Sequence, residues 1–165
     1  MAKLNDPHAL FMHQLREMLY VERTLADQIL PEMEQEVRDE KLRKGIHAHV
    51  EQTKEQAQNL EKAFDLLGQP AEPQKSPALD GLKKSHDQLA SDIGDERLRD
   101  LFDAEAAAKT EHLEIAAYRG MIAMADSMGQ REVSDLLATN CKQEEQTLRQ
   151  LEDVTESLSR EVVSA

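Results

Sequence analysis

Two glutamates stand out in the segment from Glu105 to Tyr118, because they fall on a helix face that should be buried. The residues of this segment favour helix, and at about 100° per residue Glu111 and Glu114 share a face with Ile115 and Tyr118. A buried carboxylate is costly unless a cation, a metal ion or a shared proton accompanies it. The pair therefore predicts either a metal site or a charged partner inside the protein.

Matching acids occur on two other helical segments. Glu22 lies on the apolar stripe that carries Leu15 and Ile29, and Glu144 lies on the stripe that carries Leu148. When helices surround one core, carboxylates at the same level form a site rich in oxygen ligands, which suits iron or manganese. The four inward glutamates therefore favour a carboxylate metal site.

The segment HAHVEQTKEQ offers two further candidate ligands that compete with each other. His49 is better placed by geometry, because it lies on the polar stripe beside the core, whereas Glu51 is the better metal ligand by chemistry but points away from that stripe. A di-iron bundle usually takes a Glu-x-x-His pair from two helices. This sequence lacks that pair, because Thr147 stands three residues after Glu144.

Two residues of the opening segment are candidates for a supporting role. His112 is next to the acids, so it can act as a ligand or as a hydrogen-bond donor to one. The hydroxyl of Tyr118 can reach a metal-bound carboxylate, although Tyr118 is also a normal amphipathic core residue.

The order of helices that must position these residues predicts an all-α, ferritin-like four-helix bundle with one extra short helix. A long crossover between two antiparallel hairpins distinguishes this topology from a simple up-and-down bundle. We expect residues 1–165 to form a single domain. The first helix should start at Asp6-Pro7 and kink or end near Leu30, with a continuation to about Arg38. The remaining expected elements are a helix from Asp39 to Gly68, a Pro-rich linker over 68–78, a short helix over 79–93, a helix from Asp95 to about Met128, and a helix over about 131–162.

Composition excludes several classes of function. The net charge of −13 provides no basic stripe for nucleic acid and disfavours an anionic membrane surface. The apolar runs are too short to span a membrane, and the chain does not open with a secretory signal pattern. A single cysteine excludes an internal disulfide. We therefore expect a cytoplasmic protein that binds neither nucleic acid nor membranes.

The segments LFMHQLREMLYVERTL, HAHVEQTKEQAQNLEKAFDLLG, KTEHLEIAAYRGMIAMADSMG and QEEQTLRQL together resemble the YciE/YciF-type bacterial stress proteins, a ferritin-like group related to rubrerythrin. The resemblance covers about residues 8 to 155. It implies a homodimer, a di-iron-type carboxylate site and a role in osmotic and other stress responses. The chain departs from its relatives at Gln52, where they often carry Glu, and Gln56 stands where they often carry His or Gln.

Residues and resemblance together predict a site for two iron ions, or for manganese or another divalent metal. The chemistry would be Fe(II) oxidation or peroxide reduction if the protein is an enzyme. Two alternatives stay open: a metal-free structural or interaction bundle, whose inward acids are neutral or paired with Arg or Lys, and a partner-binding module with an exposed apolar stripe. The predicted metal ligands are Glu22, His49, Glu51, Glu111, Glu114 and Glu144, with His112 and Tyr118 beside them.

Overall fold

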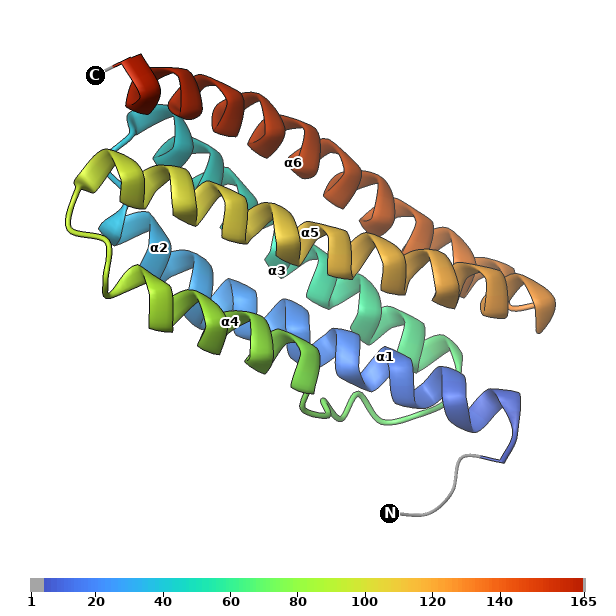
Figure 1. Ribbon diagram of the computed structural model, residues 1–165. Helices are drawn as coiled ribbons and strands as arrows, with labels where there is room; N and C mark the ends of the chain where they lie inside the picture. The colour runs from blue at the N-terminus through green and yellow to red at the C-terminus, as the bar shows by residue number, and fades with distance from the viewer. Residues whose placement is uncertain (1–4, 165) are drawn as a thin grey trace.

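The computed structural model describes residues 5–164, and the regular structure in this range is entirely helical. Four long helical segments form a bundle, and a shorter helix lies against its side (Figure 1). The elements in chain order are α1 (Pro7–Thr24), η1 (Leu25–Ile29), α2 (Leu30–Glu36), α3 (Glu40–Leu66), α4 (Pro77–Ala90), α5 (Glu96–Ser127) and α6 (Arg131–Ser164).

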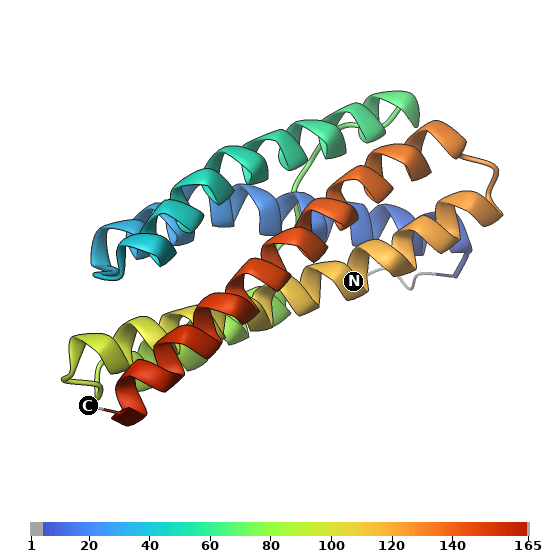
Figure 2. The same cartoon turned by 90° about the horizontal axis from the view of Figure 1, so that it is seen from above.

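The long segments form two antiparallel hairpins. The continuous segment α1–η1–α2 pairs with α3, and α5 pairs with α6 (Figures 1 and 2). A linker and α4 then carry the chain back along the bundle, so that α3 and α5 run in the same direction (Figure 2). This long crossover is the ferritin-like topology. The expected fold class is therefore confirmed.

Local sequence explains where the helices begin. The side chains of Asp6, Asp39, Ser76 and Asp95 each accept a hydrogen bond from a backbone N–H in the first turn of the following helix. The extra helix starts at Pro77, directly after its Ser76 cap and two residues earlier than predicted, and it ends at Ala90 rather than at residue 93. Gly129, with φ of 73°, makes the left-handed turn that separates α5 from α6.

The first helix passes through Pro31 instead of ending there. Pro31 has no N–H to donate, and the wide π turn η1 immediately precedes it, with the N–H of Leu30 bonded to the carbonyl of Leu25. The helix then continues only to Glu36, not to Arg38 as expected. The Asp100 carboxylate accepts hydrogen bonds from the backbone N–H groups of Arg38 and Asp39, which fixes the turn into α3.

The bundle core is apolar in the half that contains the start of α1 and polar in the middle. Phe11, Leu15, Leu60 and Phe64 are completely buried in the half that contains the start of α1. Midway along the segment α1–η1–α2, and midway along α5 and α6, core positions are instead occupied by charged and amide side chains. Burial of these groups without compensation would be costly, so the middle layer is the candidate functional site.

Candidate metal centre

Five titratable side chains from four helices meet in the middle layer. Glu22 comes from α1, His49 from α3, Glu111 and Glu114 from α5, and Glu144 from α6, and all are at least nine-tenths buried. They form two overlapping groups, and within each group the ligand atoms lie within 4.8 Å of one another. The groups are His49, Glu111 and Glu144, and Glu22, Glu114 and Glu144. Glu144 belongs to both and therefore lies between them.

Most of the polar atoms in this cluster have no hydrogen-bond partner. His49 Nε2 lies 3.1 Å from Glu111 Oε1, and Tyr118 donates a hydrogen bond to Glu22 Oε1. Both oxygens of Glu114 and of Glu144, Oε2 of Glu22 and of Glu111, and Nδ1 of His49 are buried without a partner. Buried polar atoms are normally hydrogen-bonded, so a concentration of unpaired ones is typical of side chains that bind a cation or share protons.

Tyr118 connects the cluster to a second layer of hydrogen bonds. Its hydroxyl accepts from Asn140 Nδ2 at 3.0 Å while it donates to Glu22. Asn140 Nδ2 also donates to the backbone carbonyl of Gln56 at 3.1 Å, and Asn140 Oδ1 accepts from Asn59 Nδ2 at 2.9 Å. The chain of contacts therefore fixes the ring of Tyr118 and, through it, the orientation of the Glu22 carboxylate.

Burial makes the carboxyl groups weak acids. It raises the pKa of Glu111 to about 7, and burial together with the charge of Glu111 raises the pKa of Glu144 to about 9. Burial first, and then the charge of Glu144, hold the pKa values of Glu22 and Glu114 well above their usual range. Without a cation the cluster thus retains protons at neutral pH, and a bound ion would have to displace them.

The structure brings together five of the six predicted ligands. Glu51 is the exception, because its side chain is exposed and forms an ion pair with Lys54, with 2.7 Å between Nζ and Oε1. Of the two candidates on α3, only His49 has its side chain in the cluster, as its position on the polar stripe predicted. His112 is also exposed on α5, so it supports no member of the cluster, whereas Tyr118 contacts Glu22 as expected.

Sequence reasoning missed the role of Asn140. Asn140 is completely buried and stands four residues before Glu144, so it lies on the same face of α6. An amide one helical turn from an inward carboxylate was the signal that could have identified Asn140.

Two glutamines of α3 lie near the cluster. Gln56 is buried with both side-chain polar atoms unpaired. Gln52 is half-buried, and its Oε1 accepts a hydrogen bond from Thr147 at 3.1 Å.

The residues present fit a metal-ion pair. Carboxylates from three helices and one imidazole provide the oxygen-rich, nitrogen-containing ligand set that iron and manganese accept. The unpaired oxygens on both sides of Glu144 provide free ligand atoms for two neighbouring ions. Only one histidine is present among these ligands, so the site differs from the usual arrangement with two Glu-x-x-His pairs.

The topology and the buried cluster define a ferritin-like helical bundle with a carboxylate–histidine centre. The chain belongs to the DUF892 family, described as a domain of unknown function, whose profile matches residues 6–164. It is 27% identical to protein YciF of Escherichia coli strain K12 over 145 residues, which is 87% of each chain. The resemblance to the YciE/YciF-type proteins is thus confirmed.

Solved structures agree with this assignment. The crystal structure of the E. coli stress protein YciF superposes with a TM-score of 0.89 at 25% identity, over 95% of this chain and 99% of YciF. YcfI of Rhodopseudomonas palustris, for which a role as a structural protein has been suggested, superposes with a TM-score of 0.88 at 31% identity, over 91% of this chain and 95% of YcfI.

Among the described residues, no helix combines the length and the apolar character needed to cross a membrane.

Proposed function

We propose that this protein binds two divalent iron or manganese ions in the middle of the bundle. The observation that carries the proposal is the position of Glu144, which belongs to both groups of ligand atoms and has two unpaired buried oxygens. One ion would be held by His49, Glu111 and Glu144, and the other by Glu22, Glu114 and Glu144.

Charge balance supports two ions rather than one. Four buried carboxylates carry four negative charges when ionised, which two divalent ions neutralise. Buried charges are tolerated when they are paired in good geometry and satisfied by further ligands, whereas a single divalent ion would leave two carboxylates to keep protons. In the metal-free cluster, burial first and then the charge of Glu144 raise the pKa values of Glu22 and Glu114 well above their usual range, and bound cations would offset both effects.

The proposed activity is Fe(II) oxidation or the reduction of peroxide. A role in a stress response is part of the proposal, because E. coli YciF is described as a stress protein. A bound iron pair supplies the one-electron and two-electron redox chemistry for either reaction. Glu144 would be a ligand of both ions, Tyr118 would keep Glu22 oriented, and burial would separate Glu22, Glu114 and Glu144 from bulk water. A cytoplasmic homodimer is part of the same proposal.

Metal analysis of two matched variants tests this function. We expect protein purified without a histidine tag, and supplied anaerobically with Fe(II), to retain about two irons per chain, the number that carboxylate-bridged bundles hold. Glu144→Gln should lose both ions, because it removes the ligand that both groups share. Glu145→Gln changes only a partly exposed ion pair with Arg119 and should retain them. Wild-type protein that retains neither iron nor manganese would overturn the proposal.

A metal-free structural bundle is the second candidate. The contact between His49 and Glu111, the raised pKa values and the role suggested for YcfI favour it. In that case the cluster would hold shared protons instead of ions, and Glu144→Gln would leave the metal content at zero while it stabilises the fold. The same pair of variants therefore separates the two functions.

A further inference from the structure

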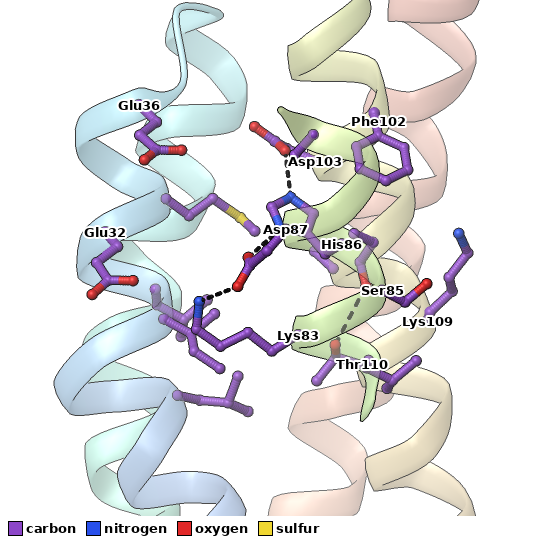
Figure 3. Close-up of a pocket in the computed structure, with 18 of the residues that line it drawn as sticks. Glu32, Glu36, Lys83, Ser85, His86, Asp87, Phe102, Asp103, Lys109 and Thr110 are labelled. Atoms are coloured by element: carbon purple, nitrogen blue, oxygen red, sulfur yellow. Dashed lines mark hydrogen bonds and ion pairs between the residues drawn. The ribbon is translucent and has the colours of Figure 1, made fainter. Parts of the chain in front are cut away.

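A cavity of about 440 Å³ lies on one side of the bundle, between η1–α2, α4 and α5 (Figure 3). Its walls are largely apolar and include Ile29, Met33, Leu82 and Phe102. Charged side chains from α2 and α4 lie around it, among them Glu32, which is exposed. The cavity is therefore accessible from solvent at the level of α4.

The cavity reaches the metal-ligand cluster from one side only. His49 and Glu111 line it, whereas Glu22, Glu114 and Glu144 do not. His49 has an unpaired Nδ1 and Glu111 an unpaired Oε2, although both side chains are more than nine-tenths buried. The cavity thus ends beside His49 and Glu111, two members of the group that Glu144 completes, and leaves the group of Glu22, Glu114 and Glu144 enclosed behind them.

One face of α5 follows the cavity towards the cluster. Asp103, Ala107 and Glu111 all line it, and each stands one helical turn from the next. Since a helix rises about 1.5 Å per residue, this face spans about 12 Å. Ala106 and Ala107 are partly exposed and contribute only methyl groups, so the cavity is open beside Glu111.

We propose that this cavity is the route by which divalent cations reach the centre, so that the group of His49, Glu111 and Glu144 is loaded before the group of Glu22, Glu114 and Glu144. The inference rests on the proposed metal-binding function. Carboxylates outnumber lysine and arginine in the lining, and the net charge of −13 raises the local concentration of cations. The same negative charge would repel an anionic substrate.

The test is the rate at which Co(II) enters metal-free protein, followed by visible absorption after rapid mixing. Ala107→Leu fills the cavity one turn before Glu111, and Ala106→Leu fills it from the neighbouring position if the first variant does not fold. Ala116→Leu, at an exposed position of the same helix, is the matched control. A narrowed route raises the barrier for entry and for release equally, so it leaves the affinity unchanged.

We expect Ala107→Leu or Ala106→Leu to slow Co(II) uptake by about tenfold or more, which corresponds to about 1.4 kcal/mol of added barrier. The final number of bound ions should match that of the wild type and of Ala116→Leu. Unchanged uptake rates in folded, cavity-filled variants would overturn the route while the metal site stands. A changed number of bound ions at an unchanged rate would overturn it too, because the new side chain would then act on the ligands. Wild-type protein that takes up no Co(II), Fe(II) or Mn(II) would overturn the metal-binding function itself.

Discussion

His49 Nε2 and Glu111 Oε1 lie 3.1 Å apart across the space between α3 and α5. This is the distance of a hydrogen bond between an imidazole and a carboxylate, so the two groups share a proton in the metal-free protein. An ion held by both side chains would have to displace that proton. This relationship makes His49 the most informative residue of α3.

Replacement of His49 by alanine should weaken binding of the ion held by Glu111 and Glu144. Loss of a residue that supports a ligand typically lowers the metal affinity by about 10–100-fold. Loss of the ligand itself should lower the affinity by at least as much. Isothermal titration with Mn(II) measures the change. Glu51→Gln is the control on the same helix, since Glu51 is exposed and contacts Lys54. A loss of affinity in Glu51→Gln but not in His49→Ala would show that the ligand assignment on α3 is wrong.

Tyr118→Phe tests the contact that orients Glu22. The variant removes the donor to Glu22 Oε1 and the acceptor for Asn140, so two buried polar groups lose a partner. We expect the metal-free protein to lose about 1–3 kcal/mol of unfolding free energy, and the metal affinity to fall by about tenfold or more.

The control for Tyr118→Phe is Tyr20→Phe. The hydroxyl of Tyr20 donates to Asp80 at 2.9 Å in an exposed hydrogen bond between α1 and α4, away from the cluster. Its loss should change the unfolding free energy by about 0.5 kcal/mol or less and should leave the metal affinity as it is. Urea denaturation gives both free energies. Equal effects of the two variants would show that Tyr118 has no special role.

The metal-free protein should become less stable as the pH rises. The pKa values of Glu111 and Glu144 are raised to about 7 and about 9, whereas both carboxyls ionise near their usual value of 4.5 in the unfolded chain. Between these limits the folded state holds more protons than the unfolded chain, so its stability falls with increasing pH. Ionisation of buried, unpaired carboxyls is the physical cause.

Melting temperatures measured in chelator at about pH 5.5, 7 and 9 would reveal this slope. Glu144→Gln should flatten it, and Glu145→Gln should not. Excess Mn(II) should reverse the trend, because deprotonated carboxylates bind the ion more tightly at high pH. A metal-free wild type whose melting temperature is constant over this range would contradict the raised pKa values.

Helical periodicity predicted much of this site because one face of a helix is set by residue spacing alone. Glu22, Glu111, Glu114 and Glu144 could each be assigned to an inner face, and the long crossover then placed their helices around one core. The choice between His49 and Glu51 needed the structure, because the better ligand by chemistry was the worse one by direction.

Other features could not be derived from spacing. The contact between Tyr118 and Asn140 depends on how α5 and α6 are shifted along each other, which periodicity does not specify. The cavity beside Glu111 depends on where α4 lies, and a short amphipathic helix can pack at several places on a bundle. The π turn before Pro31 likewise required the observed backbone hydrogen bonds.

Gln52 is the position where a single change should strengthen the site. Gln52 lies on α3 three residues after His49 and four before Gln56, and its Oε1 accepts a hydrogen bond from Thr147, which is three residues after Glu144 on α6. It therefore lies one turn from ligands on both helices. Gln52→Glu would keep the acceptor for Thr147 and add a carboxylate near the ion that we assign to His49, Glu111 and Glu144. We expect about tenfold tighter Mn(II) binding, together with a less stable metal-free protein, because the new carboxylate repels the existing ones.

Gln58→Glu is the control, because it adds the same charge at an exposed position of α3. It should change neither the Mn(II) affinity nor the stability of the metal-free protein. Titration calorimetry and thermal unfolding of the two variants would decide, and equal Mn(II) affinities for both would place Gln52 outside the reach of the ions.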